Sequence, residues 1–595
     1  MEEITKQELP IGQAEIKEFM DALHRYKAGK AQTEKRILSS ENWWKLRNTA
    51  EELRDGAMRE QGFASKSGWL HNVIVSKHAD AVEAYPEPNI LPREEADIRE
   101  ARMLSAIIPC VLEQNRFEQT YSDVIWQKLK TGTGVYKIFW DGNRLGGLGD
   151  IGIERVNLLN LYWEPGITDI QKSRYLFHTE LQDKALLRQK YPILADKLNG
   201  TGFVSTRFLY DDAVSDADKA TVIDVYYRKN VNGKQVLHYC KFVDDVVLYA
   251  TENDDRTGLD PQGGVRPAPC EAGLYDHGRY PYIFDTLYPI EGSPCGYGFV
   301  DLCRNPQTEI DLLKTAFVKN AKVGAVPRYF SRVDGNVNEE QFLDLEQALV
   351  KVSGNVDEAT LRKIEHNSLD GNYIAMLDRT IDELRQTSGN TESSTGTATS
   401  GVTAASAIAA LQEAAGKGSR DATMASYRAY AQLVELAIEL IRQFYDMPRQ
   451  FRITGSMGGH EYVTYHNSGL RPVVQPGLGM ETLMRLPVFD IKISAQKRNI
   501  YTKVSQNELA LQFFKLGFFD PRLTDQALLC LEMMDFDGRD RILQRLSQRL
   551  QTMPVLPAVD IPQGDVTLSR STEHSTVRKA REAALNAAVP RQEAV

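Results

Sequence analysis

The chain reads NPQTEIDLLKTAFVKNAKVG at residues 305–324 and NYIAMLDRTIDELRQT at residues 372–387, and it continues through SGNTESSTGTATSG (388–401) into AASAI (404–408). Apolar residues recur at helical spacing in the first two segments, which predicts two amphipathic helices. At 1.5 Å per residue the first helix is roughly 30 Å long. The pattern therefore predicts two rod-like helices, here called struts, that are joined by an insertion and followed by a flexible loop.

The first strut and the insertion have recognisable ends. We expect the strut to open after Asn305, with Pro306 at its first helical position, and to close at Gly324. The insertion at 327–371 has more acidic than basic residues, and its pattern predicts a short strand at 328–332. These features alone are also typical of an ordinary helical hairpin whose connecting loop contains an insertion.

The loop after the second strut is unusual in its composition. It carries no Lys or Arg, and Glu392 is its one charged residue. A segment this polar and rich in glycine cannot bury itself, so the composition predicts a mobile loop. A long helix follows and continues to Tyr445, and Gly416 and Gly418 are placed to bend or interrupt it.

The rest of the chain predicts an α+β body. Helices are expected at 14–27, 42–46, 69–84, 94–112 and 117–130, with a turn at 86–89. Alternation of apolar and polar residues then predicts strands at 135–140, 151–156, 174–181, 222–228, 236–242 and 246–249. Because Asn232-Gly233 is a strong hairpin signal, we expect antiparallel pairing.

Composition narrows the functional classes. The 595 residues are enough for several domains, 42% of them are hydrophobic, and the net charge is −10. No apolar run approaches the ~20 residues that span a bilayer, and the first residues lack a secretory pattern, so no membrane contact is expected. The six cysteines are scattered without a CxxC pair, which favours free thiols made in a reducing cytoplasm.

Three segments resemble known ligand-binding motifs, but their sequence context does not fit the sites that those motifs mark. Residues 147–152 match GxGxxG, but the following residues alternate as a strand, which indicates a hairpin loop and not a dinucleotide site. Residues 416–419 (GKGS) lack the Ser directly after Lys that a phosphate-binding loop needs. His460 and His466 have the wrong spacing for one metal-binding helix face. We therefore expect no catalytic residue, no cofactor and no metal.

Several short stretches, in this order along the chain, resemble the portal proteins of tailed bacteriophages. They are Thr131-Gly132-Thr133-Gly134, Gly292-Ser293-Pro294 with Gly296, Pro306-Gln307-Thr308-Glu309-Ile310-Asp311, Asn320-Ala321-Lys322, Thr387-Ser388-Gly389 and Ala404-Ala405-Ser406-Ala407-Ile408. No single stretch is diagnostic, but their order and spacing together are specific. The resemblance covers the chain from about residue 41 to residue 550.

The resemblance implies a portal fold and a domain order. The expected parts are an N-terminal α/β wing (1–304), the first stem helix (305–326), a small α/β clip (327–371), the second stem helix (372–387), a tunnel loop (388–403), a long kinked helix with the C-terminal part of the wing (404–510), and a helical crown with the C-terminal tail (511–595). Proteins of this kind form a ring, usually of about twelve subunits, at one capsid vertex. They are not enzymes.

The resemblance also implies partners. The ring would pass double-stranded DNA without reading its sequence, and it would meet the large terminase subunit, the major capsid and scaffolding proteins, and the head-completion adaptor and tail proteins. It would be assembled in the host cytoplasm and remain in the virion for genome retention and ejection.

Three sets of residues are candidate contacts. The tunnel loop would face DNA with Asn390, Thr391, Ser393, Ser394, Thr395, Thr397, Thr399 and Ser400. The clip would contact terminase and adaptor proteins with Glu339, Glu340, Asp344 and Glu346. The crown would face packaged DNA with Arg541, Arg545 and Arg549, although a solvated arginine face explains that spacing equally well.

Two other classes stay open on sequence alone. A nucleic-acid-processing enzyme needs a carboxylate or histidine cluster, and none is evident. A scaffold or baseplate component of a virion, without a DNA channel, would also lack catalytic residues. That class does not account for the order of helical hairpin, polar loop and long helix.

Overall fold

The computed structural model describes most of the chain outside the insertion, the polar loop and the C-terminus. The described residues are 10–46, 66–197, 218–231, 233–259, 265–325, 329–331, 361–363, 371–390, 417–454, 460–476, 482–495, 500–516, 524–534 and 542–543. Contacts divide the chain into two compact units, Met1–Leu509 and Ala510–Val595.

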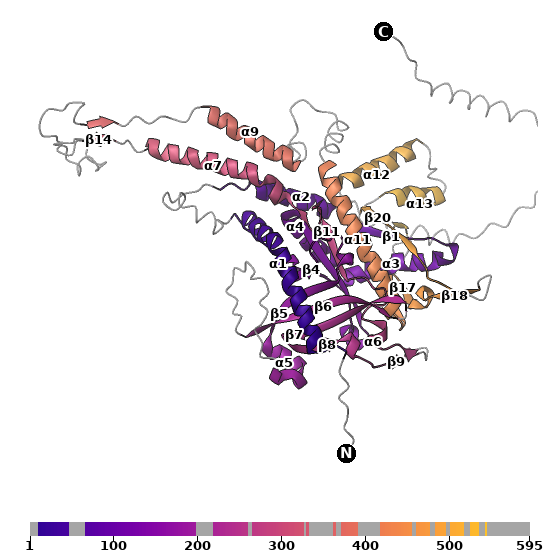
Figure 1. The fold of residues 1–595 in the computed structure, drawn as a ribbon. Coiled ribbons are helices and arrows are strands. Elements are labelled where there is room, and N and C mark those ends of the chain that lie inside the picture. Colours follow the sequence, from indigo (N-terminus) through magenta and orange to yellow (C-terminus); the bar gives the residue numbers. More distant parts are fainter. Residues whose placement is uncertain are drawn as a thin grey trace, which may run out of the picture. The chain divides into compact units, whose positions relative to one another are not determined.

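The first unit contains both helices and strands (Figure 1). The described α-helices are α1 (Gln13–Trp44), α2 (Trp69–Glu83), α3 (Ile98–Gln114), α4 (Phe117–Thr131), α5 (Lys184–Lys190), α6 (Pro269–Ala272), α7 (Phe299–Ala325), α9 (Gly371–Ser388), α11 (Lys417–Phe444), α12 (Ile500–Lys515) and α13 (Thr524–Met533). The strands that build the body are β1 (Pro86–Pro92), β2 (Thr133–Asp141), β3 (Asp150–Arg155), β4 (Leu161–Trp163), β5 (Tyr175–Asp183), β6 (Lys219–Val231), β7 (Lys234–Val243), β8 (Val246–Ala250), β11 (Tyr282–Thr286) and β20 (Phe489–Ala495).

Shorter strands complete the chain. They are β9 (Gly258–Leu259), β10 (Val265–Arg266), β12 (Tyr288–Pro289), β13 (Gly296–Tyr297), β14 (Tyr329–Ser331), β15 (Leu361–Lys363), β16 (Arg449–Thr454), β17 (His460–Tyr465), β18 (Val473–Pro476) and β19 (Thr482–Arg485). β14 confirms the short strand predicted at the start of the insertion, where it pairs with β15.

The main sheets are antiparallel, as the sequence predicts. One sheet has five strands in the order β4-β5-β6-β7-β8, and another has three in the order β11-β2-β3. The connection between β6 and β7 is the predicted hairpin, in which Val231 faces Lys234 and Gly233 has a φ of 84°. Of the residues that match GxGxxG, 147–149 lie in the connection between the paired strands β2 and β3, and 150–152 begin β3, which confirms a hairpin loop followed by a strand. The α+β fold class is therefore confirmed.

α1 is one helix of 32 residues, so the prediction of two separate helices was wrong. Its apolar face, which includes Phe19 and Leu23, packs on Phe177 and Phe242 of the five-stranded sheet. The helix continues through Gly29, where a Cβ would meet Pro165 Cγ at 2.4 Å, so the close approach of Pro165 requires glycine at this position. Tertiary packing thus outweighs the weak helix signal of residues 28–41.

The second core surrounds α4 and α11. Phe117 and Tyr121 of α4 contact each other and lie in the same buried cluster as Tyr136 of β2 and Leu433 of α11. The turn from α4 to β2 depends on Gly132, whose φ is 87° and whose added Cβ would lie 2.4 Å from the carbonyl carbon of Tyr297. Two of the glycine-rich stretches noted in the sequence therefore touch each other in space.

The segment around Pro86 is a strand and not the predicted turn. β1 pairs with β20 along its whole length, from Pro86 opposite Ala495 to Pro92 opposite Phe489. Prolines are tolerated in an edge strand because the missing N–H groups face away from the ladder. The partner strand lies about four hundred residues further along the chain, so the local sequence could not reveal the pairing.

α7 begins at Phe299, six residues before the start that the sequence predicted. Pro306 therefore lies inside the helix and removes one backbone hydrogen bond. The preceding turn is stabilised by burial of Phe299 and Val300 and by the N–H of Gly298, which donates to Asp301 Oδ2 at 3.1 Å. Burial of this turn outweighs the local cost of proline.

A loop after α6 ties the end of α11 to the five-stranded sheet. Asp276 accepts two hydrogen bonds from the guanidinium of Arg442, at 3.0 and 2.6 Å. Tyr275 pairs with Leu237 of β7, and the ring of His277 stacks on Tyr275 at 5.3 Å. Burial, assisted by the neighbouring cations, lowers the pKa of His277 to about 3.

The folded state should weaken in mild acid because of His277. Its pKa in the folded chain is about 3 and rises to ~6.5 on unfolding, so the unfolded chain binds the extra proton as pH falls below ~6.5. Stability from this group is complete above that pH and declines below it, by about 2 kcal/mol at pH 5. Urea unfolding at pH 7.5 and pH 5 measures this loss.

His277 Nδ1 accepts a hydrogen bond from Arg279 N at 3.0 Å. His277→Asn retains an oxygen that can accept this bond and should remove most of that pH dependence. His24→Asn, at an exposed position of α1, is the matched control and should keep it. Parallel pH profiles for the wild type and His277→Asn would contradict the assignment.

Candidate functional site

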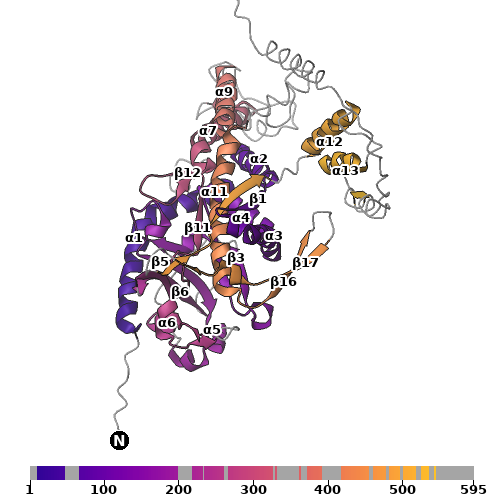
Figure 2. The same ribbon diagram turned by 90° about the vertical axis from the view of Figure 1, so that its right-hand side faces the viewer.

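The two strut helices lie side by side in both views (Figures 1 and 2). α9 confirms the second predicted strut to within one residue at each end. Near the body, α7 and α9 bury Ile310, Thr315, Leu384 and Ser388. The halves further from the body are largely exposed, in α7 from Lys319 onwards and in α9 up to Arg379.

Polar side chains of α7 hold the start of α2. Asp311 Oδ1 accepts hydrogen bonds from Ser67 N at 2.8 Å and from Ser67 Oγ at 2.7 Å. Gln307 Oε1 accepts from Leu70 N at 3.0 Å, and its Nε2 donates to Ser67 O at 2.9 Å. Backbone N–H groups at a helix start have no partner within the helix, so α7 caps α2 with its own side chains.

The end of α9 is also fixed to α2. Gly389 has a φ of 65°, and the N–H groups of Gly389 and Asn390 donate back to Gln386 O and Arg385 O, which closes the helix. Ser76 Oγ of α2 donates to Asn390 Oδ1 at 3.2 Å. Asn390 is 7% exposed.

One lysine of α2 connects the two ends of segment 391–416. Lys77 Nζ donates to Gly389 O at 3.4 Å, just before the segment, and to Ser419 Oγ at 3.0 Å, just after it. Ser419 Oγ in turn donates to Asp80 Oδ2 at 3.0 Å. Burial lowers the pKa of Lys77, and the nearby carboxylate of Asp80 opposes that change. We name Lys77, Asp80, Gly389, Asn390 and Ser419 the loop anchor.

A second buried lysine fixes the first turns of α11. Lys128 Nζ lies 2.6 Å from Asp285 Oδ1, and the two side chains are 1% and 0% exposed. The same ammonium group donates to Ser426 Oγ at 2.7 Å and to Ala422 O at 2.9 Å, while Ser426 Oγ donates to Asp285 Oδ2 at 2.8 Å. Because every charge here has a partner, α11 is held to α4 and β11 at a defined position.

The residues predicted from sequence are only partly described by the structure. Asn390 is described, and it lies in the loop anchor. The other predicted DNA-facing residues, Thr391, Ser393, Ser394, Thr395, Thr397, Thr399 and Ser400, lie outside the described residues. So do the clip residues Glu339, Glu340, Asp344 and Glu346 and the crown residues Arg541, Arg545 and Arg549. Their roles stay predictions.

The sequence analysis missed Ser76, Lys77 and Asp80. They come from a helix more than three hundred residues before their partners, and a lysine in an amphipathic helix gives no local signal. The polar serine and glycine residues that border the segment were visible, but the helix that holds them was not.

The described part of the chain includes the cysteines that the sequence predicts to be unpaired. Its six cysteines are all free, which confirms the prediction of unpaired thiols. Within that part, no group of three His, Cys, Asp or Glu side chains could hold a metal ion. No described helix is long and apolar enough to cross a membrane. What the geometry provides is a fixed base for two helices and a loop.

Two comparisons with known proteins bear on this arrangement. The family model of phage P22-like portal proteins matches residues 79–262 and 270–593, which together make up most of the chain. No curated protein matches the sequence.

Loss of the Lys77 ammonium group should loosen both ends of segment 391–416. Lys77→Met leaves Gly389 O and Ser419 Oγ without this donor, which should destabilise the fold by about 1–3 kcal/mol. Hydrogen exchange should also become faster in the first turns of α11. Urea unfolding and exchange mass spectrometry measure the two effects.

Lys172→Met, which removes an exposed lysine elsewhere, is the control and should change neither quantity. Unchanged exchange in residues 419–426 of Lys77→Met would show that the anchor does not hold this end of the loop.

Proposed function

The chain belongs to the family of phage P22-like portal proteins, and from this premise we propose that it forms a ring whose central channel conducts double-stranded DNA. Proteins of this family are structural and not enzymes; they sit at a capsid vertex and serve DNA packaging and the joining of head and tail. The proposal concerns how this chain builds the channel and what its parts contact.

The observation that carries the proposal is the exposed apolar surface of the helix pair. Ile374 and Met376 of α9 are 55% and 52% exposed, and Leu312, Val323 and Tyr373 are also exposed. Two helices that extend from a body cannot cover such residues by themselves, and exposed apolar surface of this kind marks a contact site. Neighbouring helix pairs in a ring would cover it.

We propose that α7 and α9 are the stem and that the ring has about twelve subunits. A head-to-tail contact between identical subunits closes into a ring when the rotation between them allows it. Each stem pair would then pack between two neighbours, with Ile374 and Met376 at these contacts.

The charge of the chain suits a conduit. A protein that grips DNA neutralises phosphates with many Lys and Arg side chains, and it binds with a steep dependence on salt. Each such contact must break again as a duplex advances. A chain with a net charge of −10 and a loop without Lys or Arg does not bind DNA phosphates strongly at any one position. Its hydroxyl groups can still form hydrogen bonds with phosphates.

Residues 388–403 would be the tunnel loop, and the loop anchor would hold its start at Gly389 and Asn390 and the chain that follows it at Ser419 of α11. Because both ends are fixed to α2, the loop can move against DNA without shifting the stem. In this arrangement Asn390 would be the fixed first member of the DNA-facing set, and the other members would be Thr391, Ser393, Ser394, Thr395, Thr397, Thr399 and Ser400.

The remaining assignments follow from the resemblance. The clip, through Glu339, Glu340, Asp344 and Glu346, would meet the terminase large subunit and later the adaptor and tail proteins. The crown, through Arg541, Arg545 and Arg549, would face packaged DNA. The ring would thus serve genome retention and ejection as well as packaging, after assembly with capsid and scaffolding proteins in the host cytoplasm.

Charges at two exposed positions of α9 should prevent ring formation. Ile374→Glu with Met376→Glu places two carboxylates where neighbouring stems would pack, so we expect monomers in size-exclusion chromatography with light scattering. Leu186→Glu, at an equally exposed position of α5, is the control and should assemble normally. Normal rings from the α9 variant would contradict the proposed stem contact.

Positive charge in the tunnel loop should slow packaging. Thr395→Lys with Thr397→Lys adds ammonium groups that hold phosphates as DNA advances, whereas Thr395→Gln with Thr397→Gln adds similar length without charge. In a packaging assay we expect a lower rate for the lysine variant only. Equal rates and equal genome lengths for both variants would contradict contact between the loop and DNA.

A further inference from the structure

A cavity of about 260 Å³ lies where the ends of α1, α4 and β3 meet. The charged and amide side chains that line it are Glu41 and Lys45 at the end of α1, Gln127 and Lys130 of α4, Arg155 of β3, and Asn157 just after β3. A water molecule takes up only about 30 Å³, so the cavity has room for a small ligand. The function proposed above makes no use of these residues.

The wall of this cavity carries an excess of positive charge. Lys45, Lys130 and Arg155 bring three positive charges and Glu41 brings one negative charge, so the net charge is +2. Glu41 Oε1 lies 2.5 Å from Lys130 Nζ and neutralises that lysine. The remaining charge belongs to Lys45 and Arg155, and it favours a ligand with two negative charges.

Three donor groups of the wall have no acceptor among the described residues. Gln127 Oε1 is enclosed, so Nε2 is the end of that amide which a ligand can reach. Asn157 Oδ1 accepts a hydrogen bond from Leu159 N at 3.0 Å, which leaves Nδ2 of Asn157 as a donor. The guanidinium of Arg155 is exposed and forms no ion pair with a described residue. Polar groups in protein cavities usually have partners, so these donors indicate a ligand rich in acceptor atoms.

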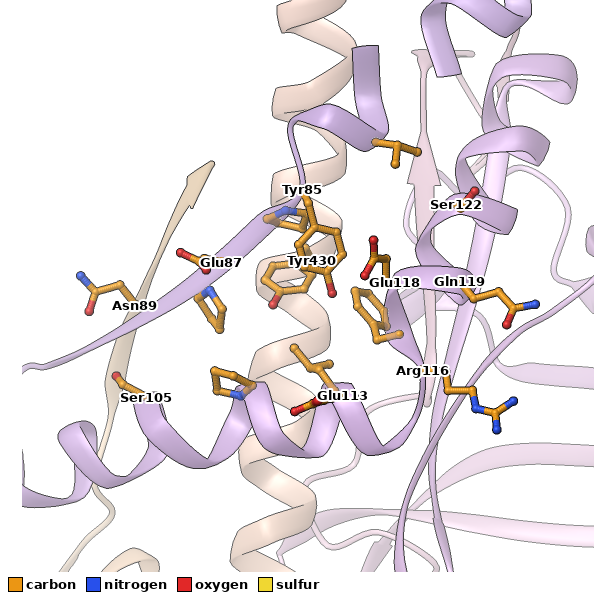
Figure 3. Close-up of a pocket in the computed structure, with 16 residues that line it drawn as sticks. Tyr85, Glu87, Asn89, Ser105, Glu113, Arg116, Glu118, Gln119, Ser122 and Tyr430 are labelled. Atoms are coloured by element: carbon orange, nitrogen blue, oxygen red, sulfur yellow. The ribbon is translucent and has the colours of Figure 1, made fainter. Parts of the chain in front are cut away.

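The cavity in Figure 3 has the opposite character. Its volume is about 1060 Å³, and the figure shows Glu87, Glu113 and Glu118 around it, with Arg116 as the one labelled cation. Carboxylates repel an anion, so we do not expect phosphate to bind there. Arg116 is exposed, as Arg155 is, which makes it a matched control for the smaller cavity.

A phosphate dianion suits both the charge and the donors of the smaller cavity. It carries two negative charges and oxygen atoms on all sides, so Arg155, Gln127 and Asn157 can donate to it together, and a guanidinium can bind two of its oxygens at once. A carboxylate has one charge and two oxygens in one plane, and it would satisfy fewer of these donors. Duplex DNA has one charge on each phosphate, and it is far too wide to enter a cavity of this size.

We propose that this cavity binds a phosphate dianion, either as the free ion or as the end of a phosphomonoester. The bound group would connect the end of α1 to α4 and β3, which are distant from α1 in the sequence. The inference goes beyond the proposed ring and does not depend on it, because every residue of the site belongs to one chain.

Isothermal titration calorimetry of the full chain tests the site, with inorganic phosphate and glucose 6-phosphate as probes at pH 8 and constant ionic strength. Both probes are mainly dianions at this pH. We expect saturable binding of at least one of them with one site per chain, and the tighter probe shows whether the site takes the free ion or an ester. Arg155→Gln with Lys45→Gln should weaken the binding at least about tenfold, because charge-assisted hydrogen bonds are lost.

The matched control is Arg116→Gln with Lys172→Gln, which removes the same charge from exposed positions outside the cavity and should bind like the wild type. Circular dichroism establishes that each variant is folded. A short duplex without terminal phosphates should not compete with the probe. The proposal would be overturned by a wild type that binds neither probe, by equal affinities of the two double variants, or by competition from the duplex. Each of these results leaves the proposed ring untouched.

Discussion

Two buried ammonium groups determine how the functional helices are arranged. Lys77 and Lys128 lie in the interior, where an unpaired charge is very costly, so their hydrogen-bond partners must stay in place. The partners of Lys77 come from the end of α9 and the start of α11, and those of Lys128 come from β11 and α11. The need to satisfy two lysines thus fixes one stem helix and both ends of the polar segment.

The same architecture leaves the chain incomplete as a single copy. Its base is fixed by polar contacts, while the outer halves of α7 and α9 expose apolar residues such as Ile374. A ring of identical chains would cover the exposed apolar residues of the stem, and the loop without Lys or Arg would be free of deep electrostatic attraction to DNA.

Much of the fold could be predicted from local sequence, because the period of two identified β2, β3 and β5 to β8, and helical spacing identified α9. Elements that depend on distant partners were missed. The strand at Pro86 exists because of β20, and the early start of α7 exists because Phe299 is buried. The polar, glycine-rich composition of the segment predicted a loop between α9 and the long helix. The roles of Lys77 and Asp80 in the loop anchor could not be predicted, because about three hundred residues separate them from their partners.

The most direct test of the central claim is electron microscopy of the purified full-length chain, with mass photometry on the same sample. The account predicts rings of about twelve subunits with a central hole wide enough for a DNA duplex and with α7 and α9 around it. Particles that remain monomers or dimers at high concentration, or rings in which α7 and α9 lie away from the hole, would contradict it.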